Sequence, residues 1–296
     1  MSLRDDLIDA LAPVADQLAE RVPGEPVEEL AVRHSHVRQA TECPAAAALD
    51  GETPFEATPA LVSWELAAQA ADLLVHGHRD PQRAGGPTTP AGALALATEE
   101  VTDNWAFDWW ASAGEAERSV AEAAAVRRLS ALARMASSWP PEGPVTVGHR
   151  PSWRFPNRAL VLKGRVDLVI GRRGDGHTLV VVLGGDHRAE VTRRAAFEAV
   201  VEAAALNRPP AWVLMALPDA GWKRPVRVDD ALLRDGVAVA AEAASVALAA
   251  VRRDATGLDR RPGARCRRCV HSANCPPGGK WLANTGRVRL GFLPPR

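Results

Sequence analysis

The 296-residue sequence contains no tyrosine, only three lysines and only four cysteines, and none of its apolar stretches is long. No window reaches the roughly 18 continuous apolar residues of a membrane span, so we expect no membrane contact. The first residues, Met1 to Asp6, lack the basic and then apolar pattern of a secretory signal. This absence predicts a cytoplasmic protein.

The sequence also lacks a net charge, but its charges are unevenly distributed. Residues 1–30 carry eight acids against two arginines, whereas residues 252–289 carry ten bases against two acids. A surplus of this size can neutralise several phosphates, which favours nucleic-acid contact. A solvated surface, or compensation of an anionic thiolate cluster, is the alternative. The basic residues expected to make this contact are Arg260, Arg261, Arg265, Arg267, Arg268 and Lys280.

The four cysteines are arranged as one plus three. Cys43 lies near the N-terminus, and C-x2-C-x5-C follows more than two hundred residues later at Cys266, Cys269 and Cys275. Thiolates are soft, charged ligands, and four of them can hold a zinc ion or an iron–sulfur cluster. Two disulfides or four unrelated thiols are the alternatives, and a reducing cytoplasm argues against disulfides. The spacing therefore favours a metal or iron–sulfur centre.

Hydrophobic periodicity divides the chain into helices and strands. It predicts helices over about 1–30, 59–75, 93–112, 115–138, 190–206 and 230–253. It predicts strands over 145–150, 159–171 with a break at Gly164, 178–184, 211–217 and 225–228. The uninterrupted apolar run from Val180 to Leu183 is typical of a strand covered on both faces. Three strands, a helix and a strand in this order predict a mixed α/β core.

We expect four segments along the chain. Residues 1–30 form an acidic N-terminal helix, and 31–140 hold the first cysteine and a helical subdomain. Residues 141–255 form the α/β core, and 256–296 hold the cysteine cluster and a basic tail.

Three features together resemble the iron–sulfur-stapled branch of the PD-(D/E)xK nucleases, which includes RecB- and AddB-type and CRISPR-associated exonucleases. They are the one-plus-three cysteines, the Gly164-Arg-Val-Asp167 motif between them, and the segment from His34 to Pro44, which ends in Cys-Pro. The resemblance covers about residues 33 to 282. It implies a restriction-endonuclease-like mixed sheet flanked by helices, with a helical insertion. It also implies a 4Fe–4S cluster, with zinc as the alternative, that joins the N- and C-terminal segments through Cys43, Cys266, Cys269 and Cys275.

The same family uses three carboxylates to hold Mg²⁺ or Mn²⁺, together with a lysine. Asp167 matches the first acid. The second acid and the lysine fall on Val182-Leu183-Gly184, which bind no metal, and a shifted alternative would use Asp186 or Glu190. One carboxylate cannot hold a divalent ion tightly. We therefore expect a degenerate nuclease domain in which Asp167 is structural and caps a turn or pairs with Arg165 or Arg172.

The other positions of the family motif are also changed. The upstream glutamate falls near Gly148-His149, a helix histidine falls on Gln69, and the Q-x-x-x-Y signature falls on Ala196 to Val200. Histidines are expected mainly on the surface, and His271 is the one that could replace a thiol.

Three functions remain open at this point. The first is a nucleic-acid-binding accessory protein in repair, recombination or defence, with DNA and a helicase or another protein as partners. The second is an active exonuclease that needs Mg²⁺ or Mn²⁺. The third is a redox-sensing or protein-interaction module.

Overall fold

The computed structural model describes residues 2–19, 29–50, 57–79, 89–100, 105–137, 143–157, 159–183, 190–217, 222–267 and 269–290. The chain forms two compact units, each assembled from separate stretches of sequence. The cysteine unit comprises Met1–Thr53, Arg154–Leu162 and Val237–Arg296, and the sheet unit comprises Pro54–Trp153 and Lys163–Gly236. All four cysteines therefore belong to one unit, and Asp167 belongs to the other.

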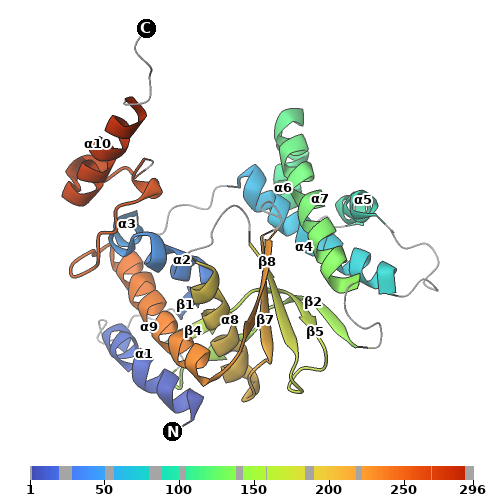
Figure 1. Ribbon diagram of the computed structural model, residues 1–296, viewed down its shortest axis with the longest axis horizontal. Coiled ribbons are helices and arrows are strands. Elements are labelled where there is room, and N and C mark those ends of the chain that lie inside the picture. Colours follow the sequence, from blue (N-terminus) through green and yellow to red (C-terminus); the bar gives the residue numbers. More distant parts are fainter. Residues whose placement is uncertain are drawn as a thin grey trace. The chain divides into compact units, whose positions relative to one another are not determined.

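Helices make up most of the described chain (Figure 1). They are α1 (Leu3–Ala19), α2 (His34–Glu42), α3 (Pro44–Asp50), α4 (Pro59–Arg79), α5 (Pro90–Glu100), α6 (Trp105–Ser112), α7 (Glu115–Ser137), α8 (Val191–Leu206), α9 (Asp230–Arg252), η2 (Ala264–Arg267), η3 (Ser272–Asn274) and α10 (Pro276–Leu290). The strands are β1 (Leu30–Arg33), β2 (Val145–His149), β3 (Ser152–Arg154), β4 (Leu160–Lys163), β5 (Val166–Ile170), β6 (Thr178–Val182), β7 (Trp212–Leu217) and β8 (Trp222–Arg227).

The sheet unit is built on a five-stranded sheet in the order β2-β5-β6-β7-β8. Strands β2, β5 and β6 are antiparallel neighbours, β6 and β7 are parallel, and β8 returns antiparallel to β7. The parallel pair needs a crossover, which α8 supplies. Helix α8 ends at Asn207, whose left-handed backbone (φ 57°) terminates the helix.

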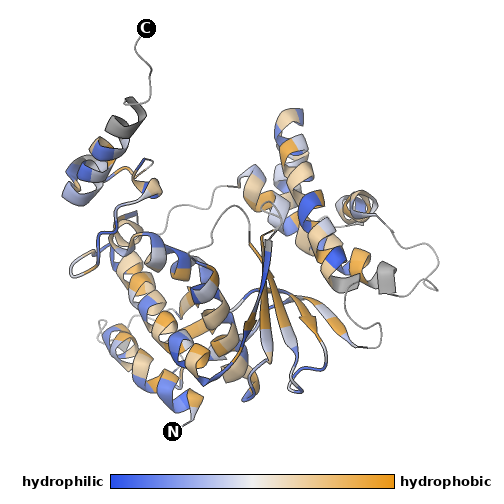
Figure 2. Ribbon diagram, viewed as in Figure 1, coloured by the Kyte–Doolittle hydropathy of each residue, from blue (hydrophilic) through white to orange (hydrophobic). Residues whose placement is uncertain are grey.

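Both faces of this sheet are covered, which confirms the expectation from the apolar run in β6. Val180 and Val182 pack into a core with helices α4, α5 and α7. Leu179 and Val181 point the other way, into a core with α8. Figure 2 shows apolar residues along these strands. The start of α9 touches α8 closely, because a Cβ on Gly236 would lie 2.5 Å from the carbonyl oxygen of Ala196.

In the cysteine unit, α2 and α3 meet at the Cys43-Pro44 junction. Ala40, Ala47 and Val246 form a small buried cluster that joins these two helices to α9. Helix α1 buries Leu7 and Leu11 completely. Alanine dominates these contacts, and its small side chain lets helices approach closely.

The predicted mixed α/β core is confirmed, and most of its elements begin and end within a few residues of the expected positions. Three predicted elements differ. The helix predicted over 1–30 corresponds to α1 (Leu3–Ala19), and Leu30 already begins strand β1. The helix predicted over 93–112 corresponds to two helices, α5 and α6. The two halves of the strand predicted over Ala159–Gly171 lie in different sheets, because β4 pairs with β1 and β3 whereas β5 joins the five-stranded sheet. The turn between them is fixed by a hydrogen bond from the Gly164 N–H to the Pro151 carbonyl, 2.8 Å. Among the described helices, none combines the length and apolar character needed to cross a membrane.

Candidate functional site

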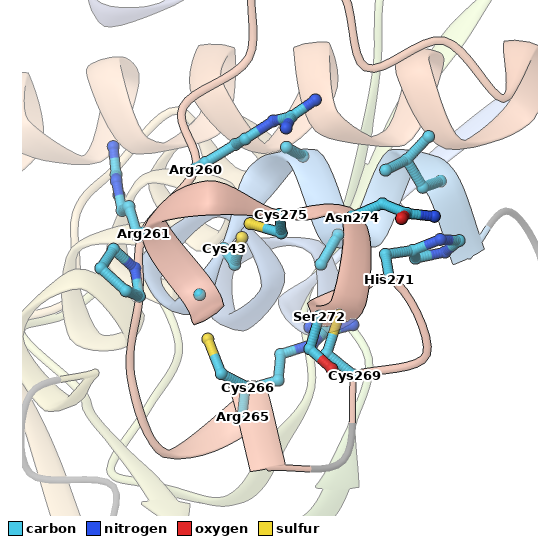
Figure 3. A pocket seen from close by; sticks show the side chains of 15 residues that line it. Cys43, Arg260, Arg261, Arg265, Cys266, Cys269, His271, Ser272, Asn274 and Cys275 are labelled. Carbon is cyan, nitrogen blue, oxygen red and sulfur yellow. The ribbon is translucent and has the colours of Figure 1, made fainter. Parts of the chain in front are cut away.

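The four cysteines line one cavity of about 180 Å³ in the cysteine unit (Figure 3). Cys43 follows α2 directly and Cys266 lies in η2. Cys275 follows η3 and immediately precedes α10. All four carry free thiols. The fold therefore brings together the one distant cysteine and the three clustered ones.

Two details of the cavity fit a group bound by thiolates. A Cβ on Gly278 would lie 3.3 Å from the Cys275 sulfur and 3.5 Å from the Cys266 sulfur, so glycine leaves room beside them. The Gly263 N–H donates to the Cys266 sulfur at 3.4 Å, and hydrogen bonds of this kind stabilise metal-bound thiolates. No three Cys, His, Asp or Glu side chains of the described residues stand close enough to hold a single ion. The thiols thus face a common space without meeting at one point.

Arginines join the Cys43 segment to the C-terminal cysteines. Arg265 contacts Asp50 at 2.8 Å and Glu42 at 3.5 Å, which lie at the ends of α3 and α2. Arg261 donates to the Ala40 carbonyl at 2.7 Å. These contacts occupy two of the six basic residues expected to bind nucleic acid. These contacts of Arg261 and Arg265, called the clamp below, hold the Cys43 segment against the C-terminal cysteines through protein groups alone.

Of the other expected nucleic-acid ligands, Arg260, Arg267 and Lys280 are exposed. Arg267 lies over the ring of Trp281, 5.5 Å from its centroid. Arg268 lies outside the described residues.

His271 lines the cavity, but Figure 3 shows its ring directed away from the sulfurs. Its Nε2 lies 3.2 Å from an Asp50 oxygen. In this arrangement His271 is paired with a carboxylate.

Asp167, in the sheet unit, accepts a hydrogen bond from the backbone N–H of Val182 at 2.7 Å. Val182 is the residue that stands where the family motif has its second acid. Burial raises the pKa of Asp167, against the opposing pull of Arg165, the Val182 N–H, Arg194 and Arg150. Among the described residues, Asp167 forms no ion pair within 4 Å with Arg165 or Arg172, but the charge of Arg165 still acts on it, and the carboxylate accepts its hydrogen bond from the Val182 backbone.

Glu198, on α8, is a second carboxylate beside Asp167 and is completely buried. It accepts the Arg165 N–H at 2.9 Å and pairs with Arg194 at 2.7 Å. Burial raises its pKa to about 7, although Arg194 and the Arg165 N–H act in the opposite direction. The position of Glu198 also requires a glycine at position 164, because a Cβ there would lie 2.5 Å from a Glu198 oxygen.

The shifted acids give no metal site in the part of the chain that the structure describes. Glu190 is buried and precedes α8, where its carbonyl accepts the Arg194 N–H at 2.8 Å. It forms no three-ligand group with Asp167 and Glu198. Asp186 lies outside the described residues.

A second buried cluster was not expected from the sequence. Glu202 contacts His149 at 2.8 Å, His177 at 3.1 Å and Arg173 at 3.1 Å. The expectation that histidines lie mainly on the surface is therefore wrong for His149 and His177. Burial acts to raise the pKa of Glu202, but the hydrogen bonds from its partners outweigh it and lower that pKa. The signal was a pair of acids, Glu198 and Glu202, four residues apart in a part of α8 that is otherwise apolar from Ala195 onward.

No protein family matches the chain. No curated protein matches it. Among solved structures, a crystal structure of SSO0001 is similar with a TM-score of 0.36 and 11 % sequence identity, over 91 % of this chain and 95 % of that one. A match at this TM-score carries no argument about function, and the comparisons assign the chain to no family.

Proposed function

We propose that this chain is a nucleic-acid-binding iron–sulfur protein whose nuclease-like sheet does not cleave. Its role would be that of an accessory factor in DNA repair, recombination or defence. The observation that carries the proposal is the environment of Asp167. This carboxylate accepts a hydrogen bond from the backbone of Val182, and the positive charges that act on it are those of Arg165, Arg194 and Arg150.

The order of the sheet supports the nuclease-like part of the proposal. Three antiparallel strands are followed by a crossover helix and a parallel strand. The Gly164-to-Asp167 motif leads into the middle one of those three strands, and its aspartate faces the neighbouring strand. One hard divalent ion needs several oxygen ligands, and guanidinium groups in their place repel it.

For the cofactor, we propose a structural 4Fe–4S cluster on Cys43, Cys266, Cys269 and Cys275. Closing a loop of more than two hundred residues restricts the unfolded chain, so a bound cluster would stabilise the fold. Anaerobic purification followed by metal analysis tests this. A brown protein with about four irons per chain supports the cluster, and one zinc per chain in a colourless protein would overturn it in favour of the alternative.

For the ligand, we propose DNA bound through the exposed cations Arg260, Arg267 and Lys280. Affinity should fall steeply with salt, because each neutralised phosphate contributes a slope of about 0.9 in log affinity against log salt. Measuring this slope for the wild type and for the double variant Arg260→Gln/Lys280→Gln tests the idea. Arg154→Gln is the matched control, since Arg154 is 64 % exposed in the same unit and pairs with Glu29.

The expected result is weaker binding and a slope lower by roughly two for the double variant, with the control unchanged. Absence of DNA binding by the wild type at low salt, or binding that ignores salt, would refute the proposal.

A further inference from the structure

Two arginines of the sheet unit lie close enough for their charges to act on each other. Arg150 follows β2 and is exposed, and Arg165 lies between β4 and β5 and is half-buried. Neither guanidinium forms an ion pair with any residue that the structure describes. One terminal nitrogen of Arg165, Nη2, is buried and has no hydrogen-bond partner among those residues.

The backbone brings these two residues together. Arg150 precedes Pro151 and Arg165 follows Gly164, and the Gly164 N–H donates to the Pro151 carbonyl at 2.8 Å. The contact is tight, because a Cβ on Gly164 would lie 2.7 Å from the Pro151 ring. The spacing of the two arginines is therefore set by a rigid junction between two chain segments.

Arg165 is held in place by contacts that do not engage its guanidinium in a salt bridge. Its backbone N–H is bound by Glu198, and its guanidinium carbon lies 5.7 Å from the ring centroid of Trp64. Trp64 is itself fixed by Arg128, whose guanidinium carbon lies 3.9 Å from the same centroid. An aromatic ring orients a guanidinium without neutralising it.

The neighbouring carboxylates are already engaged elsewhere. Asp167 accepts the Val182 N–H, Glu198 is shared between Arg194 and a backbone N–H, and Glu65 accepts from Gln69. Partial burial and the charge of Arg165 lower the pKa of Arg150, while the charges of Asp167, Glu65 and Glu198 act in the opposite direction. Two like charges held together in this way favour a bound anion.

We propose that Arg150 and Arg165 form a binding site for one phosphate group of a nucleic acid. This site rests on the proposed function and adds a second contact to it, in a different unit from the cations near the thiols. Guanidinium groups bind phosphate oxygens through paired, planar hydrogen bonds. The site would thus hold a phosphodiester beside Asp167 through arginines, without a divalent metal.

The experiment uses the cluster-loaded chain of residues 1–296 and measures binding of a labelled single-stranded oligonucleotide and of inorganic phosphate alone. The variants are Arg150→Gln and Arg165→Gln, with Arg150→Lys to keep the charge. Arg208→Gln is the matched control, because Arg208 is 68 % exposed in the same unit and lies near Asp175. Arg150 is exposed, so its variant tests the site even where the Arg165 variant fails to fold.

We expect Arg150→Gln to weaken oligonucleotide binding roughly tenfold and to lower the salt slope by about one, with Arg150→Lys in between and the control unchanged. Oligonucleotide binding unchanged in Arg150→Gln, but weakened in Arg260→Gln/Lys280→Gln, would overturn this site and leave the proposed function standing. Loss of inorganic phosphate binding in Arg150→Gln, with oligonucleotide binding intact, would assign the site to free phosphate and overturn the nucleic-acid part. Absence of oligonucleotide binding by the wild type would overturn both.

Discussion

Replacing Gly164 by alanine should destabilise the sheet unit strongly. The new methyl group would lie 2.5 Å from a Glu198 oxygen and 2.7 Å from Pro151, both far inside van der Waals contact. Overpacking costs about 1–3 kcal/mol, and moving Glu198 away from the Arg165 N–H adds about 1–3 kcal/mol for buried groups left without partners. A stiffer unfolded chain returns less than about 1 kcal/mol. We expect a net loss of about 3 kcal/mol.

Thermal unfolding followed by circular dichroism measures this effect, and we expect Tm to fall by roughly 5–10 °C. Gly263→Ala is the control, because a Cβ at position 263 meets nothing within 4 Å. Its stability should change by no more than about 0.5 kcal/mol. In a Glu198→Ala background, Gly164→Ala should cost less, since only the Pro151 contact remains. An unchanged Tm for Gly164→Ala, or an equal cost in both backgrounds, would refute the reasoning.

Three further predictions concern the buried charges and the clamp. The pKa of Glu198 rises from 4.5 to about 7 on folding, so its contribution to stability falls as pH rises between these values, by on the order of 3 kcal/mol. Urea unfolding should therefore show an unfolding free energy that decreases with pH over this range in the wild type, and Glu198→Gln should remove this decrease. The pKa of Glu202 is lowered on folding, so its contribution to stability is full above about pH 4.5 and is lost as the pH falls further. Glu202→Gln should therefore reduce the loss of unfolding free energy below that pH in the same urea experiment. Arg265→Ala removes the contacts to Asp50 and Glu42, and it should speed loss of iron to a chelator, measured by visible absorption, whereas Arg154→Ala should not.

The sequence revealed the fold class because the pattern of the core is local. The apolar run at Val180–Leu183 marked a strand buried on both faces, and the Pro59 and Asp230 helices followed from their periodicity. Short elements were missed. Strand β1 has only four residues, and α3 is an alanine-rich segment with no clear apolar stripe of its own.

The candidate sites were predictable to a different extent. The four cysteines that the spacing singled out line one cavity, and the metal centre that the spacing favours stays a prediction. The charged groups near Asp167 were not all predictable, because Glu198 and Arg150 come from α8 and from the end of β2, and only tertiary packing brings them near it. The roles of Arg261 and Arg265 also depend on distant acids, which a count of local charges does not reveal.

The central claim is that the protein binds nucleic acid without cutting it. The most direct measurement incubates end-labelled DNA with the wild type and with Asp167→Ala in the presence of Mn²⁺, and separates the products by electrophoresis under native and denaturing conditions. The account predicts a shifted complex on the native gel and full-length DNA on the denaturing gel for both proteins. Shortened products from the wild type that disappear in Asp167→Ala would contradict it.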